Sequence, residues 1–211
     1  MSKGVSRARL VEAALQVLDE RGIDGLTVRA VADVLDVKPP ALYWHVKGKQ
    51  ELLDEMGTEI QRRIVGRLDF AGSTANWPRG LGEYARVLRA EYGRHRDGAR
   101  TFSGTRLTDP ALLAAQEPWL QAGVDSGLTL EQMVTAAQLI SNFVVGFVIE
   151  EQERAQSGEQ RYSLADRDSA LTDAPLSRAA GRVIFENADQ RFERQLGILL
   201  EGLATTRPSI E

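Results

Sequence analysis

The segment 26–49 constrains the fold more than any other part of this chain, and it reads LTVRAVADVLDVKPPALYWHVKGK. Thr27 is placed to cap a helix, and the apolar residues that follow recur at the i, i+3, i+4, i+7 spacing of one helix face. These apolar residues are Val28, Val31, Ala32 and Leu35. Asp36 tolerates a left-handed backbone at the reversal, and the prolines at 39–40 suit the first turn of a second helix that runs to about His45. The segment therefore predicts two short helices joined by a tight turn, the layout of a helix-turn-helix DNA reader.

The second of these helices is too short to be stable alone, so packing must hold it. Its outward positions and the residues after it offer groups for base edges, sugars and phosphates. They are Ala41, Tyr43, Trp44, His45, Lys47 and Lys49. The net charge of −4 argues against a protein that coats nucleic acid without specificity, but a specific reader needs only a local positive footprint.

Helical periodicity dominates the rest of the chain, and we find no alternating strand pattern, so the expected fold class is all-α. A first helix is expected over about 7–21 and a long connecting helix over 48–68, followed by a linker at 70–78. Later helices are expected over about 79–95, 109–125, 128–155 and 183–204. Thr129 and Gln132 form a capping box for the third of these, and the polar segment 156–175 is expected to be a loop.

Composition excludes several classes of protein. The chain has no cysteine and only two histidines, so no nucleophile, base or metal constellation for an enzyme presents itself. The longest apolar region, 139–149, falls short of the ~20 residues that cross a bilayer, and no secretory leader is evident. We therefore expect a cytoplasmic protein that is not an enzyme and has no membrane partner and no cofactor.

The run ALYWHVKGKQELLD at 41–54 resembles the end of the recognition helix and the start of the next helix in the TetR family of transcriptional repressors. GIDGLT at 22–27, and RDGAR and GTR within 96–106, are similar to the tetracycline repressor branch of that family. The resemblance implies a three-helix helix-turn-helix domain at 1–48 that continues into a connecting helix at 49–68. It also implies a helical ligand-binding and dimerisation domain at 69–211.

The resemblance also implies which residues contact DNA. Arg29 stands where an arginine of the branch contacts guanine, and the expected contact residues are Arg29, Lys38, Pro40, Ala41, Tyr43, Trp44, His45, Lys47 and Lys49. Two positions depart from the branch, because Pro39 replaces a base-reading glutamine and Ala41 replaces a threonine. Neither side chain can donate a hydrogen bond, so we expect a double-stranded operator that differs from the tetracycline operator.

The same alignment argues against a metal–tetracycline effector. Phe102 stands in place of the metal-binding histidine, and Val65, Tyr84 and Trp119 stand where the branch holds the drug with a histidine, an asparagine and a glutamine. A phenyl ring cannot coordinate a hard cation, so no metal site is expected. The expected ligand-binding residues are Tyr84, Leu88, Phe102, Thr105, Arg106, Trp119, Asn142, Phe143 and Phe147, and they predict a largely apolar or aromatic small-molecule effector.

Two questions stay open at this point. The last helix is too apolar on one face to lie in water, and it either forms a homodimer with a second copy, as the resemblance implies, or packs within its own chain. The expected function is a ligand-released repressor that binds a palindromic operator as a homodimer. The alternative is a ligand-independent or activating DNA-binding regulator.

Overall fold

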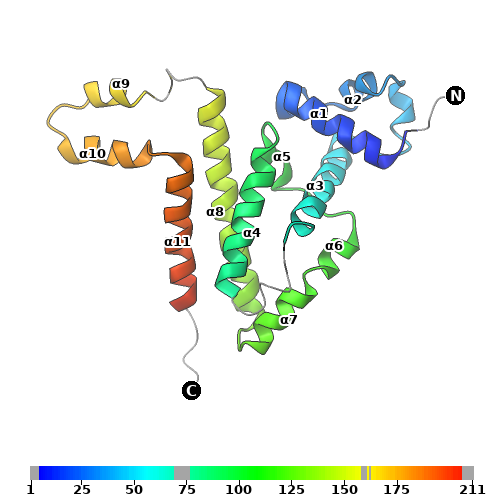
Figure 1. Ribbon diagram of the computed structural model, residues 1–211. Helices are drawn as coiled ribbons and strands as arrows, with labels where there is room; N and C mark the ends of the chain where they lie inside the picture. The colour runs from blue at the N-terminus through cyan, green and yellow to red at the C-terminus, as the bar shows by residue number, and fades with distance from the viewer. Residues whose placement is uncertain (1–4, 69–76, 158–160, 162, 206–211) are drawn as a thin grey trace.

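The structure is a computed structural model, and it describes residues 5–68, 77–157, 161 and 163–205. Helices make up nearly all of its regular structure and these residues include no strand, which confirms the all-α class (Figure 1). The N-terminal elements are α1 (Arg7–Gly25), α2 (Val28–Val34), the 3₁₀ turn η1 (Pro39–Ala41) and α3 (Lys49–Val65). The later elements are α4 (Trp77–Gly93), α5 (Gly98–Phe102), α6 (Pro110–Ala114), α7 (Glu117–Asp125), α8 (Leu130–Gln156), α9 (Leu164–Ser169), α10 (Pro175–Ile184) and α11 (Ala188–Thr205).

The first three helices pack as the apolar pattern predicts, with α1 in contact with both α2 and α3. Their side chains meet in a buried core that includes Leu10, Ala14, Leu18, Leu26, Val31, Leu42, Leu52 and Met56. Thr27 caps α2, because its Oγ1 accepts a hydrogen bond from the backbone N–H of Ala30 at 3.0 Å. Asp36 has a φ of 53°, so the chain reverses at the residue that tolerates this conformation.

The element after this turn differs from the expected helix to His45. It is a single 3₁₀ turn followed by further turns, because the two prolines contribute no N–H groups to a helical ladder. Successive bonds hold the backbone instead, from Leu42 N to Pro39 O at 3.0 Å and from His45 N to Leu42 O at 2.9 Å. Leu42 and Val46 are fully buried, so packing against α1 and α2 fixes a segment that is too short to be stable alone.

The first helical segment of α1 ends at Gly22, as predicted, and a short helical segment follows it. Gly22 adopts a φ of 70°, which kinks the helix, and the chain resumes helical geometry to Gly25. The cause lies far along the sequence, because the backbone N–H of Ile23 donates to Asp97 Oδ2 at 3.0 Å. A carboxylate from a later loop thus satisfies the backbone group that the kink frees.

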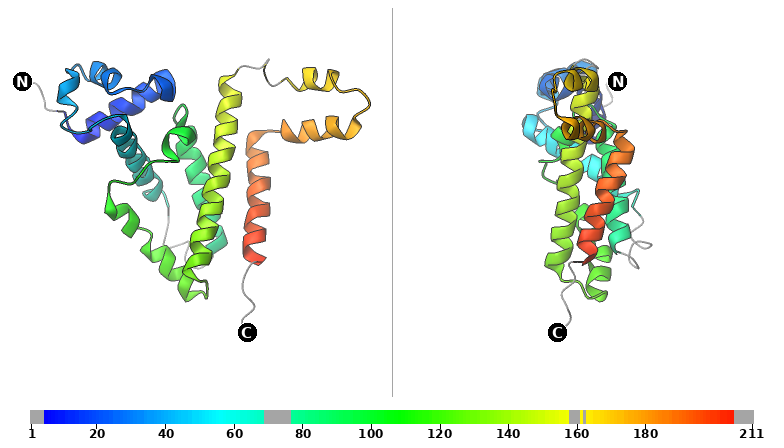
Figure 2. Two further views of the ribbon diagram at one scale, coloured as in Figure 1. Left: turned by 180° about the vertical axis from the view of Figure 1, so that it is seen from behind. Right: turned by 90° about the vertical axis from the view of Figure 1, so that its left-hand side faces the viewer.

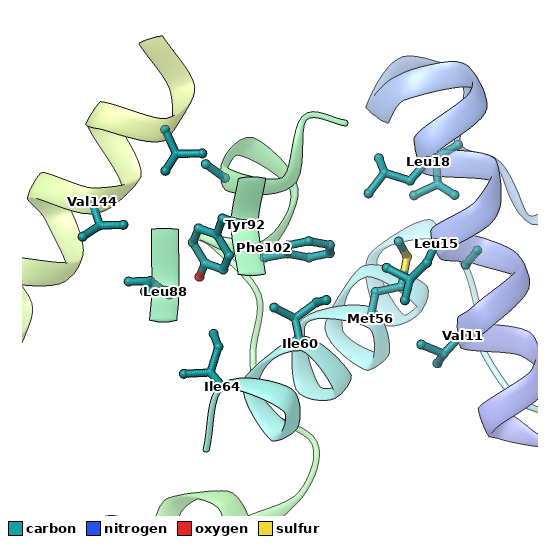
Figure 3. Packing of buried hydrophobic residues seen from close by; sticks show 14 of the residues in the cluster. Val11, Leu15, Leu18, Met56, Ile60, Ile64, Leu88, Tyr92, Phe102 and Val144 are labelled. Atoms are coloured by element: carbon teal, nitrogen blue, oxygen red, sulfur yellow. The ribbon is translucent and has the colours of Figure 1, made fainter. Parts of the chain in front are cut away.

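α8 is the central helix of the C-terminal part and contacts α4, α5, α7 and α11. Figures 1 and 2 show α4 and α11 running beside it, with α9 and α10 projecting on the side away from α1. Thr129 and Gln132 form the predicted capping box at its start. Figure 3 shows that the buried core continues from Leu15 of α1 through Met56 and Ile60 of α3 to Val144 of α8.

Several element boundaries differ from the sequence prediction. The helix expected over 109–125 is two helices, α6 and α7, and the one expected over 183–204 begins only at Ala188, where Asn187 Oδ1 accepts from the backbone of Asp189 at 2.9 Å. The segment 156–175, expected to be a loop, contains α9. Neither α5 nor α10 was expected as a helix of its own. Of the expected linker, residues 70–76 lie outside the described part of the chain, and 77–78 begin α4.

The expectation that no apolar stretch is long enough to cross a bilayer was wrong. By length and composition alone, α8 is long and apolar enough to do so. Its contacts are those of a core helix, because Ile140, Val144 and Val148 are fully buried against neighbouring helices. A helix at the centre of a folded domain can be as long and as apolar as a membrane-spanning helix.

Candidate functional site

The residues expected to contact DNA lie on and around η1, which packs against α2. Seven of them are exposed, namely Arg29, Lys38, Pro40, Tyr43, Trp44, Lys47 and Lys49, and Ala41 and His45 are half-buried. Trp44 is 90% exposed and Tyr43 is 54% exposed, so these aromatic rings are available for contact with a partner. Large exposed aromatic residues beside lysines are typical of a surface that meets sugars and phosphates.

Lys49 makes a further contact that the sequence did not indicate. Its Nζ donates to the carbonyl oxygen of Ile23 at 2.7 Å, and Ile23 also bonds to Asp97 from the C-terminal part. Asp97 Oδ1 accepts from Gln156 of α8 at 3.3 Å. Hydrogen bonds therefore connect the end of α1 to the start of α3 and, through Asp97, to α8.

A second group of contacts joins α1 and α8 through the loop before α5. His95 is buried, and its Nδ1 lies 3.1 Å from both carboxylate oxygens of Asp19 of α1. Gln152 of α8 donates to the carbonyl oxygens of His95 at 2.7 Å and Tyr92 at 3.2 Å. Tyr92 and His95 both contact Phe102, with ring centroids 5.8 Å apart in each pair.

Phe102 lines a cavity that has a volume of about 580 Å³. Figure 3 shows Ile60, Leu88, Tyr92 and Phe102 between α3 and α8, on the side that the cavity occupies. The lining residues come from α3, α4, α5, α7, α8 and the segments that join them. They are Gly57, Ile60, Gln61, Val65, Leu68, Gly80, Leu81, Tyr84, Leu88, Tyr92, Phe102, Ser103, Thr105, Leu107, Gln116, Trp119, Ala137, Ser141, Asn142 and Val145.

Six of the nine expected ligand-binding residues line this cavity: Tyr84, Leu88, Phe102, Thr105, Trp119 and Asn142. The other three do not. Phe143 and Phe147 pack against Phe192 of α11, with ring centroids 5.5 and 5.1 Å away, because α11 covers that side of α8. The side chain of Arg106 is 82% exposed and lies 4.0 Å from Asp54 Oδ2, and its backbone N–H donates to Asp54 Oδ1 at 3.0 Å.

The sequence analysis missed several lining residues, of which Gln61 and Gln116 bring polar groups. Gln61 lies on the same face of α3 as Gly57 and Val65, so the spacing of four residues could have identified it. Gln116 lies between α6 and α7, where no periodic signal exists. Only the packing of these short helices brings it to the cavity.

The cavity is uncharged. No described lining residue carries a formal charge, and its two tyrosines stay neutral, because burial raises the pKa of both Tyr84 and Tyr92. The Tyr84 hydroxyl already has a partner in Ser141 Oγ at 2.9 Å. Phe102 lines the cavity, and the described residues contain no cluster of three acidic or histidine side chains that could hold a metal ion.

α3 connects the cavity to the surface around η1 that carries the residues expected to contact DNA. The segment after α5 docks on this helix, where Asp54 accepts from the backbone of Arg106 and Thr58 Oγ1 accepts from the backbone of Thr108 at 2.9 Å. Gly57 lies between these two residues, and a Cβ there would come within 2.6 Å of Thr105 Cβ. Any molecule that displaces the segment 102–108 therefore acts directly on α3.

Comparisons with known proteins agree with this geometry. Residues 10–56 match the family model described as bacterial regulatory proteins of the tetR family, and residues 71–207 match the tetracyclin repressor-like C-terminal domain. The class D tetracycline repressor protein of Escherichia coli is 35% identical over 202 residues, which cover 94% of this chain and 88% of that protein.

Solved structures give the same assignment. The Streptomyces coelicolor TetR family protein ActR in complex with actinorhodin superimposes with a TM-score of 0.81 and 26% identity, covering 99% of this chain and 100% of that chain. BioQ with its natural double-stranded DNA operator has a TM-score of 0.62 and 28% identity, covering 95% and 99%. Members of this family are transcriptional regulators and not enzymes, as expected from the sequence. The chain belongs to the TetR family of transcriptional regulators.

Proposed function

We propose that this regulator is a cytoplasmic repressor that binds a palindromic operator as a homodimer and is released by a largely apolar or aromatic small molecule. The observation that carries the proposal is that one helix serves both sites. α3 starts beside Lys47 and the DNA-reading surface, and it supplies Gly57, Ile60, Gln61 and Val65 to the cavity.

Release follows from a difference in affinity between two arrangements of α3. A ligand that fits the cavity only when α3 is displaced stabilises that arrangement, and the two reading surfaces of a dimer then lose their spacing. Half-sites lie about 34–36 Å apart, so a small tilt of each α3 is enough to move one surface out of its groove. The ActR complex with actinorhodin and the BioQ complex with DNA support both kinds of partner.

Exposed apolar residues on α8 and α11 support the homodimer. Leu139 of α8 is 47% exposed and Ile198 of α11 is 65% exposed, although both helices have their other faces in the core. A second copy that places the same two helices against them would form a four-helix bundle. We expect Leu139→Glu and Ile198→Glu to produce monomers in sedimentation experiments, whereas Leu113→Glu on α6, where the side chain is 57% exposed, leaves the dimer intact.

The test of DNA binding is selection of sites from random duplex DNA, followed by titration of the selected site at several salt concentrations. We expect a palindrome bound far more tightly than random DNA. Arg29→Ala should cost about 1–3 kcal/mol of binding free energy at that site. The matched control is Arg182→Ala on α10, which removes an exposed arginine far along the chain from the residues expected to contact DNA. Failure to enrich any site would overturn the proposal.

The alternative is a ligand-independent or activating regulator. The cavity favours a ligand-responsive protein, because a core that needed no ligand would be packed without a space of about 580 Å³. Transcription from a promoter that carries the selected operator separates repressor from activator. Lower output with the protein present supports repression, and higher output supports activation.

A further inference from the structure

Three side-chain amides that line the cavity have no protein partner in the described part of the chain. They belong to Gln61 of α3, Gln116 between α6 and α7, and Asn142 of α8. Among the described residues, no hydrogen bond involves any of these three amide groups. Gln61 and Gln116 are half-buried, and Asn142 lies at the exposed rim.

Some of the other polar side chains that line the cavity are already paired or exposed to water, whereas the Tyr92 hydroxyl and the Trp119 indole N–H make no hydrogen bond within the described part of the chain. Tyr84 bonds to Ser141, and Thr105 Oγ1 donates to the carbonyl oxygen of Phe102 at 2.9 Å. Ser103 is exposed, so water can satisfy its hydroxyl. Beside the Tyr92 hydroxyl and the Trp119 N–H, the cavity thus offers carboxamides, and each of these carries both a donor and an acceptor.

We propose that the cavity takes an uncharged aromatic ligand bearing hydroxyl or carbonyl groups, and that Gln61, Gln116 and Asn142 select it by hydrogen bonding to those groups. This inference rests on the proposed function of the cavity as the effector site. It assigns the polar part of recognition to residues other than Tyr84 and Trp119, which stand where the related branch has drug-holding polar residues.

The absence of charge on the described lining disfavours an anionic ligand. A carboxylate or sulfonate that enters loses its hydration and gains no opposite charge.

The free amides also select against a pure hydrocarbon. Such a ligand would strip water from Gln61 and Gln116 and leave them unpaired, which costs about 1–3 kcal/mol for each buried group. The flat walls of Tyr92, Phe102 and Trp119 favour an aromatic ring system. The selected class therefore combines an aromatic body with a few neutral oxygen groups.

Gln61 has a second consequence, because it lies on the helix that connects to the DNA-reading surface. A hydrogen bond from the ligand to Gln61 acts on α3 directly, whereas bonds to Gln116 and Asn142 hold the ligand against the rest of the cavity. Gln61 is thus a specificity-determining residue, and its contact with the ligand also couples ligand binding to the DNA-reading surface through α3.

The test measures binding to the full-length protein without DNA, through quenching of Trp119 fluorescence. The probes are 1,8-dihydroxyanthraquinone, anthracene and anthraquinone-1-sulfonate, and a Trp119→Phe variant shows how much of the quenching comes from the cavity. We expect the dihydroxy probe to bind at least about tenfold more tightly than either of the others, a difference of about 1.4 kcal/mol.

Substitution of the amides completes the test. In Gln61→Leu and Gln116→Leu, the preference for the dihydroxy probe over anthracene should fall by about tenfold, because the hydroxyl partner is lost and the apolar wall is extended. Gln190→Leu, an exposed glutamine of α11, should leave the preference unchanged. Circular dichroism and urea unfolding confirm that each variant is folded.

Tighter binding of the sulfonate, an unchanged preference in both glutamine variants, or quenching by none of the three probes would each overturn the inference. Its failure is distinct from failure of the proposed function. A palindrome that is bound and then released by other molecules would leave the function standing without this ligand class. Selective binding of the dihydroxy probe with no operator found would leave the cavity chemistry standing without the repressor.

Discussion

Gly57 is the position where one added methyl group tests the packing of the cavity wall most directly. It lies in the middle of α3, and a Cβ there would come within 2.6 Å of Thr105 Cβ and 3.0 Å of Thr105 Cγ2. Carbon atoms do not approach this closely without strain, so Gly57→Ala must push the segment around Thr105 away from α3 or twist its side chain.

The magnitude follows from three opposing effects. Overpacking costs about 1–3 kcal/mol. Movement of Thr105 also breaks its hydrogen bond to Phe102 O (2.9 Å), worth about 0.5–1.5 kcal/mol. Alanine regains about 1 kcal/mol over glycine in a helix interior. The net loss is about 0.5–3.5 kcal/mol, which lowers the melting temperature by roughly 1–14 °C in a protein of this size.

The assay is equilibrium urea unfolding at one fixed protein concentration, because association changes apparent stability. Gly93→Ala is the matched control, since a Cβ at that helical glycine would meet nothing within 4 Å. We expect this control to be neutral or stabilised by up to about 1 kcal/mol. The double variant Gly57→Ala, Thr105→Gly should show a coupling energy of at least about 1 kcal/mol. Equal stability of the two alanine variants, with no coupling to Thr105, would refute the close approach of these segments.

Three further perturbations have defined outcomes. Thr27→Ala should lower the free energy of unfolding by about 1 kcal/mol because the N-cap bond of α2 is lost, and urea unfolding with no loss would contradict that bond. Phe192→Ala should cost about 3–5 kcal/mol by the same method, because this ring is fully buried, and a loss below about 1 kcal/mol would show that the site is not packed. Hydrogen bonds from Arg86 hold the pKa of Glu193 below its ordinary value of about 4.3. The ion pair therefore stabilises the fold above that pH, and this contribution is lost as the pH falls through the lowered pKa. NMR titration of the Glu193 carboxyl should show a higher pKa in Arg86→Gln, and an unchanged titration would contradict the ion pair.

Local patterns in the sequence determined the elements that depend on neighbouring residues. The cap at Thr27, the reversal at Asp36 and the capping box at Thr129 and Gln132 all form as predicted, because each needs only a side chain and a backbone group a few residues away. The all-α class and the family followed from the helical periodicity and from the motif at 41–54.

Tertiary structure decided the features that depend on distant segments. Beyond the break at Gly22, Asp97, 74 residues from Ile23, accepts that residue's N–H, and a further helical segment runs to Gly25. Phe143 and Phe147 belong to the core with α11 instead of the cavity, although their spacing on α8 gives no sign of the difference.

The cavity shows the same division. Apolar periodicity predicts which faces of a helix are buried. However, different helices cover different sides of α8, and only their packing decides which side faces the cavity. Gln61 and Gln116 came to the cavity in this way, from one helix face and one short junction. The sequence by itself thus determined a helical regulator with a DNA-reading segment, because those features are local. Packing between distant helices decided where the cavity lies and which polar groups line it.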